Sequence, residues 1–321
     1  MSSPQATSSS PGSPPRCQQL PAGKQFAFTI VDDTDHATIE RVGPVYKLLA
    51  ELGLRTTKTL WTNEPTLPSP YDGSSTAADP SYRRFLQDLK ADGFELALHG
   101  VTMHSSKRTE IEQGLAWYRE WFGAMPRCHI NHFKNADNIY WGRARLSNPA
   151  SRLIHAVASR EPASQGHVQG SEYFWGDICQ RHISYVRSFT YRETNLLRLG
   201  LPLVYADTQR PYAKRMFIST EGGELDSYLD AVGEEKQDQL SSEGGVCILY
   251  THFGAGFVEH GQLNPRFELL MRRLAALDGW FVPASELLDA LCQGGCANVS
   301  SKQRRELEFQ WMRGRLRHGS S

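Results

Sequence analysis

The chain has 321 residues, of which 40% are hydrophobic and 22% charged, so it can bury a sizeable core as one large α/β domain or two small ones. Its 35 basic and 35 acidic residues cancel, which argues against nucleic acid or an anionic membrane as the main partner. There is no run of about 18 apolar residues, no secretory signal and no CxxC pair, so we expect a cytoplasmic protein without membrane insertion or a disulfide framework.

Strand-like and helical patterns alternate in the first half of the chain. Residues 1–24 are rich in Ser, Pro and Gly and are predicted to form a disordered tail. Strands are then expected at 26–33, 55–61, 94–100 and 128–133, and helices at 39–52, 82–90 and 109–122.

The second half continues the alternation after an irregular stretch at 142–195, which we interpret as an insertion or long loop. Strands are expected at 201–207, 245–253 and 279–283, and helices at 265–277 and 285–291. Residues 295–321 are predicted to be a polar C-terminal tail, peripheral to the core, whose RRELEFQWMRGRLRHG stretch can form one short helix. About seven strand–helix units in one domain, 25–294, favour a (β/α) barrel over an open sheet.

Polar residues end several of the predicted strands. In a (β/α) barrel the carboxyl ends of the strands form one rim, where the chemistry is located. The residues expected at this rim are Asp32 and Asp33, His99, Asn131 and His132, Asp207, and His252. Carboxylates and imidazoles gathered in this way can bind a divalent metal and leave a further carboxylate and imidazole for acid–base chemistry, as a metal-dependent hydrolase needs.

Each of these signals has a structural alternative. Two adjacent carboxylates, Asp32 and Asp33, repel each other unless they share a cation or a proton. The same segment can be an acidic turn in which Thr34 or Asp35 caps the next helix.

The histidines are equally open to two interpretations. His99 and His104 can both be metal ligands, or one can be buried and hydrogen-bonded and the other exposed. His252 can donate a proton to a leaving group, or it can be a histidine at the edge of the core. His129 and His132 would point to opposite faces of a strand, so His132 is the better candidate for the rim.

The order of the motifs resembles the polysaccharide deacetylases, carbohydrate esterase family 4, across roughly residues 26–291. FTIVDD resembles the first motif of that family, GFELALHGVTMHS the second, and GGVCILYTHF the last, which the closing segment GWFVPASELLDAL follows. The resemblance implies a distorted (β/α)7 barrel and the removal of acetyl groups from N-acetylated sugars.

The resemblance also implies roles for individual residues. Asp32 would be the general base that activates a metal-bound water. Asp33, His99 and His104 would hold one divalent ion, expected to be Zn²⁺. His252 would be the general acid that protonates the departing amine.

Further residues are assigned from their positions. Asp207, at the end of a predicted strand, is expected to orient the catalytic histidine. Asn131, His132 and Asn135 lie in HINHFKNADN, a stretch that differs from the Arg-Pro turn of the family's third motif, and they are expected to line the substrate site.

The leading hypothesis is therefore a metal-dependent hydrolase that removes an acyl group from an N-acylated sugar. One alternative is a non-catalytic barrel that binds a carbohydrate or a protein partner, because His99 and His104 are five residues apart where the family usually has four. A less favoured alternative is a glycosidase that uses Asp32 and Asp207 as its paired carboxylates. A stoichiometric divalent ion would distinguish the hydrolase from the binding barrel.

Overall fold

The computed structural model describes residues 20–66, 73–159, 163–293 and 295–318. Most of the predicted N-terminal tail, residues 1–19, lies outside this part of the chain, as do residues 319–321. No helix in the described ranges is both long and apolar enough to cross a membrane.

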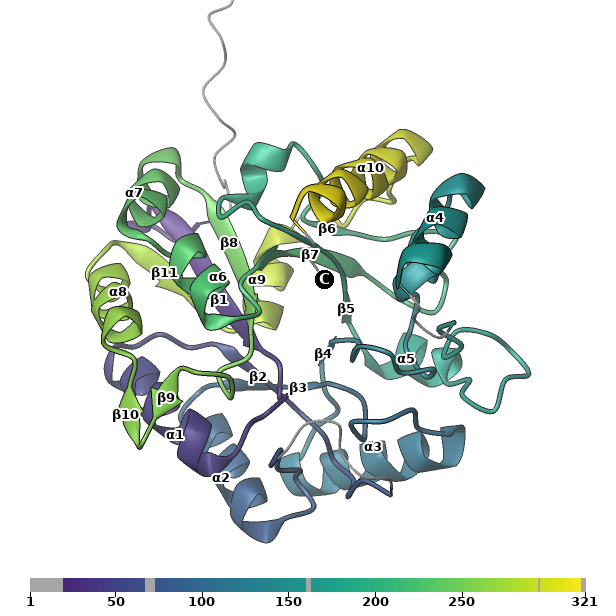
Figure 1. The fold of residues 1–321 in the computed structure, drawn as a ribbon, viewed down its shortest axis with the longest axis horizontal. Coiled ribbons are helices and arrows are strands. Elements are labelled where there is room, and N and C mark those ends of the chain that lie inside the picture. Colours follow the sequence, from purple (N-terminus) through teal and green to yellow (C-terminus); the bar gives the residue numbers. More distant parts are fainter. Residues whose placement is uncertain (1–19, 67–72, 160–162, 294, 319–321) are drawn as a thin grey trace, which may run out of the picture.

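A closed ring of seven parallel strands forms the centre of the described structure. The strands are β1 (Phe26–Asp32), β2 (Thr57–Leu60), β3 (Glu95–Leu98), β4 (Cys128–His129), β5 (Tyr185–Tyr191), β7 (Met216–Glu221) and β8 (Val246–Thr251). They pair in this order, and β8 closes the ring by pairing with β1 from Ala27–Val246 to Asp32–Thr251. Figure 1 shows the strands around a common centre with helices outside them. The predicted (β/α)7 barrel is confirmed.

Within the described ranges, four short strands lie outside this ring. β11 (Gly279–Phe281) pairs with the first half of β1, and β6 (Val204–Tyr205) pairs antiparallel with β7. β9 (Val258–Glu259) and β10 (Gln262–Leu263) form a separate hairpin. The predicted strands at 201–207 and 279–283 are therefore accessory strands and not members of the barrel.

Two barrel strands, β5 and β7, were not predicted. β5 lies inside the stretch that was expected to be irregular, 142–195. Both strands are buried, yet they carry polar side chains such as Arg187, Thr190 and Ser219. Because these side chains interrupt the apolar pattern, neither segment has the sequence signal of a buried strand.

Helices surround the barrel, and local sequence signals define where they begin. They are α1 (Ile39–Glu51), α2 (Pro80–Ala91), α3 (Arg108–Phe122), α4 (Pro149–Ser159), α5 (Gly176–His182), α6 (Leu225–Ala231), α7 (Glu234–Glu243), α8 (Pro265–Ala275), α9 (Ala284–Leu291) and α10 (Ser301–His318), with 3₁₀ turns η1 (Gly142–Arg145) and η2 (Leu196–Leu199). Asn264 caps α8 by accepting hydrogen bonds from the backbone N–H groups of Arg266 and Phe267, and Pro265 occupies the first helical position. The five helices predicted from the sequence correspond to α1, α2, α3, α8 and α9.

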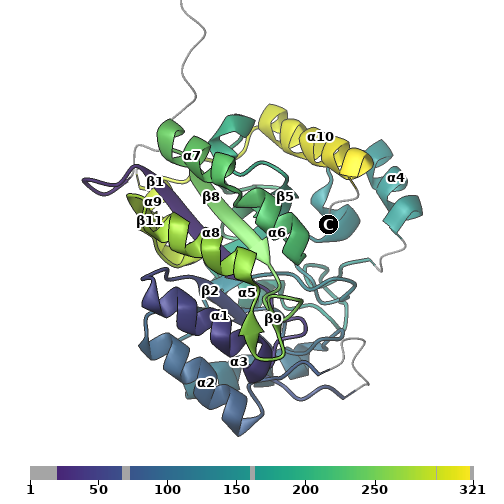
Figure 2. The ribbon, with the colours of Figure 1, turned by 60° about the vertical axis from the view of Figure 1, so that its left-hand side comes forward.

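The C-terminal segment differs from the predicted peripheral tail. It forms the 18-residue helix α10, which lies on the outside of the ring of strands, near α4 in both views (Figures 1 and 2). Leu307 is fully buried and Trp311 is 1% exposed, and both belong to the same apolar core as the barrel strands. Arg304 and Glu308 are also buried, in polar contacts. The C-terminal segment is therefore a packed helix, although most of its residues are polar.

We predict that Trp311→Ala lowers the free energy of unfolding by about 3–5 kcal/mol, because it leaves a large cavity between α10 and the barrel. Phe309→Ala is the matched control on the same helix, since Phe309 is 62% exposed, and it should have little effect. Chemical denaturation of the three proteins measures the difference. Equal stability of the two variants would show that α10 is not packed as described.

Candidate metal centre and active site

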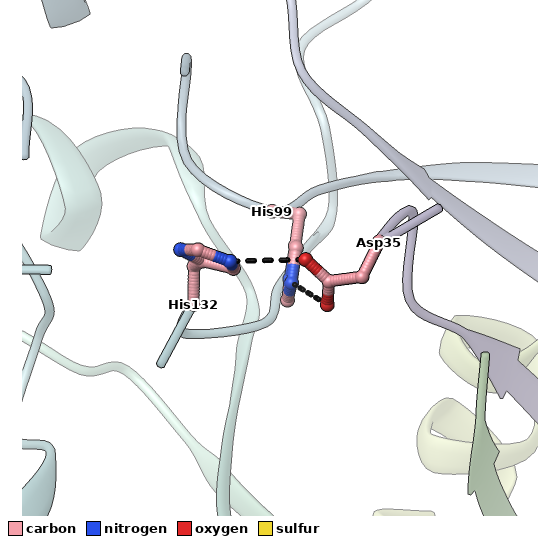
Figure 3. A group of neighbouring side chains, drawn as sticks. All are labelled: Asp35, His99 and His132. Carbon is pink, nitrogen blue, oxygen red and sulfur yellow. Dashed lines mark hydrogen bonds and ion pairs between the residues drawn. The ribbon is translucent and has the colours of Figure 1, made fainter. Parts of the chain in front are cut away.

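One buried carboxylate, that of Asp35, lies at the centre of the polar cluster on the barrel rim. Its Oδ1 is 3.0 Å from Nε2 of His132, and its Oδ2 is 3.4 Å from Nε2 of His99 and 3.1 Å from Nε2 of His252. Figure 3 shows the first two of these contacts. The four side chains follow the carboxyl ends of β1, β3, β4 and β8, so the parallel barrel brings them together.

The backbone after β1 directs Asp35 into this cluster. Pairing with β8 continues one residue beyond the strand, where the Asp33 N–H donates to the Thr251 carbonyl at 2.8 Å. The chain then turns, and the Ala37 N–H donates to the Thr34 carbonyl at 3.0 Å. Asp35 lies inside this turn. It is therefore not a helix cap, and Thr38 caps α1 instead.

The three imidazoles present the same nitrogen, Nε2, to Asp35. Nδ1 of His99 lies 3.0 Å from the Ile130 carbonyl, and Nδ1 of His252 lies 2.8 Å from the Gly223 carbonyl. Nδ1 of His132 lies 3.2 Å from Oδ1 of Asn135. Because each of these oxygens only accepts, each Nδ1 carries the proton, and Nε2 is the atom that faces Asp35.

The donor atoms suit a divalent metal ion. One nitrogen each from His99 and His132 and one oxygen of Asp35 lie within 4.8 Å of one another, and all three side chains are buried. A second group within the same limit consists of Asp33, Asp35 and His252. Two imidazoles and a carboxylate are a common ligand set for Zn²⁺ and similar ions, and hydrogen bonds at Nδ1 orient such imidazoles. The residues present therefore fit a metal.

The electrostatics of the metal-free cluster centre on the same carboxylate. Burial would raise the pKa of Asp35, but His132, His252 and His99 outweigh it and hold this pKa well below its usual range. Burial by itself would lower the pKa of His252. The hydrogen bond to Asp35 and the negative charges of Asp35 and Asp33 outweigh this effect and raise the pKa to about 9. Without a metal, both shifts favour a protonated imidazole beside an ionised carboxylate at neutral pH.

Asp33 lies beside this cluster and is held by an arginine. Arg187 of β5 binds both carboxylate oxygens, with distances of 2.8 Å from Nη2 to Oδ2 and 3.3 Å from Nη1 to Oδ1. Oδ2 of Asp33 is 3.9 Å from Nε2 of His99. The guanidinium also lies over the Tyr250 ring, 4.1 Å from its centroid. Arg187 is not among the residues expected at the site from the sequence, where its only signal is a cation inside a segment rich in β-branched and aromatic residues.

Asp32, expected to be the general base, does not reach the cleft. It is fully buried, and Nζ of Lys58 lies 2.9 Å from its Oδ2. The Tyr46 hydroxyl donates to Oδ2 at 2.9 Å, and the Phe253 N–H donates to Oδ1 at 2.8 Å. Adjacent residues of a strand point in opposite directions, so Asp33 faces the cleft and Asp32 faces the shell of helices. Asp32 therefore lies in a buried ion pair outside the cleft.

His104, expected to be a metal ligand, lies in the loop beyond the cluster. Its Nε2 accepts from the Thr66 N–H at 3.0 Å, and its Nδ1 is 3.1 Å from the Ser105 carbonyl. Neither metal-ligand group found among the described residues includes it. His132, expected to line the substrate site, takes the corresponding place beside His99 and Asp35.

The two predicted asparagines serve different parts of the site. Nδ2 of Asn135 donates to the His104 carbonyl at 3.0 Å, which directs its Oδ1 to His132. Asn135 is therefore a positioning residue for an imidazole. Asn131 lines the cleft and also bonds to the backbone of Ile139 in both directions, which closes the loop between them.

Asp207, expected to orient the catalytic histidine, is buried elsewhere. Arg304 of α10 donates to both of its oxygens, at 2.6 and 3.0 Å, and Arg210 donates to it as well. These contacts connect α10 to the loop after β6. Asp207 is therefore part of an ion-pair network away from the cleft. The group that orients His252 is instead the carbonyl of Gly223.

The cluster opens into a cleft of about 480 Å³. Asp33, Asp35, His99 and His252 line it together with residues from neighbouring loops, from β5 and β8, and from α10. These are His36, Asn131, Phe133, Trp141, Arg187, Gly223, Glu224, Tyr250, Ala255 and Arg315. A cleft of this size, with a few convergent polar groups, suits a small ligand.

Comparison with known proteins identifies the fold. No protein-family model matches the chain, and no curated protein matches it. A solved structure from Mycobacterium smegmatis, assigned as a polysaccharide deacetylase, is similar over 91% of this chain and 98% of its own, with a TM-score of 0.54 and 11% identity. A Pseudomonas aeruginosa PAO1 protein with the same assignment (88% and 95%, TM-score 0.49, 11% identity) and the Puue allantoinase (88% and 94%, TM-score 0.48, 12% identity) are also similar.

We predict that Lys58→Met lowers the free energy of unfolding by about 3–5 kcal/mol, because it leaves the Asp32 carboxylate buried without its partner. The double variant Asp32→Asn/Lys58→Met should recover much of the loss. Lys107→Met is the control, since Lys107 forms an exposed ion pair with Glu172 and its removal should leave stability unchanged. Wild-type stability in the Lys58 variant would contradict the structural role of Asp32.

We also predict the pH dependence of the metal-free protein. Because the pKa of His252 is raised in the folded state, its contribution to stability is complete below pH 6.5 and is lost as the pH rises to about 9. The corresponding slope is about 1.4 kcal/mol per pH unit for one proton. Asp35→Asn should reduce this decline and lower the pKa of His252, which NMR titration of the imidazole measures. An unchanged titration in the variant would rule out Asp35 as the cause.

Proposed function

Because the chain has the fold of the polysaccharide deacetylases, we propose that it is a metal-dependent hydrolase that removes an acyl group, such as acetyl, from an N-acylated sugar. The observation that carries this proposal is the convergence of His99, His132 and His252 on Asp35 at the carboxyl rim of the barrel, with Asp33 beside them. This arrangement supplies a ligand set, a separate carboxylate and a separate imidazole in one cleft.

Asp35, His99 and His132 would hold one divalent ion, expected to be Zn²⁺. When bound there, such an ion polarises the acyl oxygen and lowers the pKa of water. Asp35 reaches both imidazoles from the turn after β1, and the carbonyl of Ile130 and the amide of Asn135 orient the rings. This ligand set replaces the one proposed from the sequence, in which Asp33 and His104 accompany His99.

Asp33 is the candidate general base. Its carboxylate lines the cleft next to His99, and Arg187 fixes both oxygens in the cleft wall. From this position Asp33 would take a proton from the attacking water. In this scheme Arg187 is a positioning residue that keeps the carboxylate in place.

His252 is the candidate general acid. Its Nδ1 is fixed by the Gly223 carbonyl, so Nε2 faces the cleft and is the atom that would donate a proton to the departing nitrogen. His252 and Asp33 both lie close to Asp35, so acid and base flank the same reacting group. Transfer of one proton by each residue completes the hydrolysis of the amide to an amine and a carboxylate.

The lining of the cleft supports a sugar as the substrate. Trp141 and Phe133 present aromatic rings to the cleft, and Phe133 is 44% exposed. Aromatic faces suit the apolar faces of a sugar ring, while Asn131 and Glu224 are polar partners for its hydroxyl groups. A glycosidase that uses Asp32 and Asp207 is disfavoured, because both carboxylates are buried in ion pairs and neither lines the cleft.

We predict about one divalent ion per chain in the purified protein, lost in both His99→Ala and His132→Ala and retained in His104→Ala. Elemental analysis of the four proteins measures this. Loss of the ion in His104→Ala with retention in His132→Ala would restore the ligand set proposed from the sequence. Absence of an ion after reconstitution would favour the non-catalytic binding barrel.

Turnover should depend on Asp33. Asp33→Asn should keep the ion and reduce acetate release from an N-acetylated sugar by about 10²–10⁴-fold, the usual contribution of a general base. Asp32→Asn should instead act mainly through stability. A near-normal rate in Asp33→Asn would exclude Asp33 as the base.

A further inference from the structure

Tyr250 is a polar side chain of the cleft that the proposed mechanism leaves without a role. It belongs to β8, two residues before His252, and it lines the cleft although only 7% of it is exposed. Its hydroxyl oxygen lies 3.3 Å from Nε2 of His252, the nitrogen that also lies 3.1 Å from Asp35. The hydroxyl therefore lies beside the atom that would protonate the departing nitrogen.

Two groups pack against the ring of Tyr250. The guanidinium carbon of Arg187 lies over the ring, 4.1 Å from its centroid. The backbone of Gly223 approaches the edge of the ring so closely that a Cβ at this position would lie 3.1 Å from Cε1 and 3.3 Å from the hydroxyl oxygen. The carbonyl of the same glycine binds Nδ1 of His252 at 2.8 Å. One loop residue thus contacts both the imidazole and the tyrosine, and it sets their relative position.

The hydroxyl of Tyr250 is a donor whose proton His252 does not accept in its acid form. The acid carries a proton on Nε2, so the imidazole donates, the tyrosine oxygen accepts, and the O–H group is directed to another acceptor. Within the described ranges, the hydroxyl has no hydrogen-bond partner besides His252. Burial and the charge of Asp33 raise the pKa of Tyr250 well above its usual range, so the hydroxyl keeps its proton at neutral pH. A ligand in the cleft can therefore supply the acceptor.

The acyl oxygen of the substrate is the acceptor that this position favours. In the amide to be cleaved, the acyl carbon is bonded to the departing nitrogen, and the acyl oxygen is bonded to that carbon. A hydroxyl 3.3 Å from the proton donor of the nitrogen therefore lies within reach of this oxygen. Attack by water makes the oxygen negative, and a fixed donor binds such an oxygen more strongly than it binds a neutral carbonyl.

We propose that Tyr250 is a further catalytic residue, whose hydroxyl donates a hydrogen bond to the acyl oxygen as negative charge develops on that oxygen. The inference rests on the proposed function in taking His252 as the acid and an N-acylated sugar as the ligand of the cleft. The tyrosine forms no covalent bond and keeps its proton throughout. The inference gives the wall of the cleft formed by β8 a part in the chemical step beside the metal-ligand cluster.

Turnover of Tyr250→Phe tests the proposal, because this change removes one oxygen and keeps the ring beside Arg187. With the full-length metal-loaded protein and N-acetylglucosamine as the probe, kcat for acetate release should fall about 10²–10³-fold with little change in KM. The metal content should stay that of the wild type. Tyr228→Phe is the matched control and should keep the wild-type kcat. Tyr228 is fully buried, its hydroxyl donates to Sδ of Met271 at 3.2 Å, and it is not among the residues that line the cleft.

A tetrahedral analogue supplies a measurement that does not depend on turnover. In the methylphosphonamidate analogue of N-acetylglucosamine, phosphorus and its charged oxygens take the place of the acyl group, so the analogue carries the charge that develops in the reaction. In calorimetric titration, Tyr250→Phe should raise the Kd of this analogue by about the factor by which it lowers kcat/KM. The Kd of N-acetylglucosamine itself should change little, because a neutral carbonyl accepts a weaker hydrogen bond.

Several results would overturn the proposal. A raised KM at unchanged kcat would assign the hydroxyl of Tyr250 to a sugar hydroxyl instead of the acyl oxygen. A lowered kcat with unchanged affinity for the analogue would mean that the tyrosine acts only through His252. Neither acetate release nor analogue binding in the wild type would also contradict the proposal.

The two measurements separate this inference from the proposed function. Analogue binding that depends on Tyr250, without acetate release, would leave the inference standing and contradict the hydrolase. Acetate release at equal kcat in the wild type and Tyr250→Phe would support the hydrolase and contradict the role of Tyr250.

Discussion

The candidate site depends on one constraint, the burial of the Asp35 carboxylate among three imidazoles. An ionised carboxylate is stable in a buried position only where charges and hydrogen-bond donors surround it. Here the surrounding groups come from the ends of β3, β4 and β8, so the carboxylate ties together three strands that are distant in the sequence. The carbonyl and amide oxygens behind the rings complete the arrangement by determining which nitrogen faces Asp35.

Much of this arrangement follows from the sequence. Parallel strands place their carboxyl ends on one rim, and this rule alone brought Asp33, His99, His132 and His252 together as candidates. The rule does not tell which of two adjacent carboxylates faces the cleft, because the direction of a side chain depends on the register of β1 in the barrel. It also does not reveal Asp35, which reaches the cluster through a turn held by contacts with β8.

Two other features, the role of Arg187 and the packing of α10, depend on contacts between distant residues and therefore leave little signal in the sequence. Arg187 interrupts the apolar pattern of β5, and its role becomes visible only beside Asp33. The charges of α10 suggested a solvated tail, since hydropathy treats each charged residue as exposed. Arg304 is buried because Asp207 accompanies it, a pairing between residues almost one hundred positions apart that no local pattern records.

The hydrogen bonds behind the imidazoles have a consequence for how the centre is assembled. His99 and His252 are held by backbone carbonyls and His132 by Asn135, so groups of the protein itself set the orientation of each ring. These candidate ligands are thus positioned by contacts within the barrel, unlike those of small zinc domains that fold only around their metal. Metal capture would then be an exchange of protons for an ion in a finished protein, and removal of the ion would leave the barrel folded.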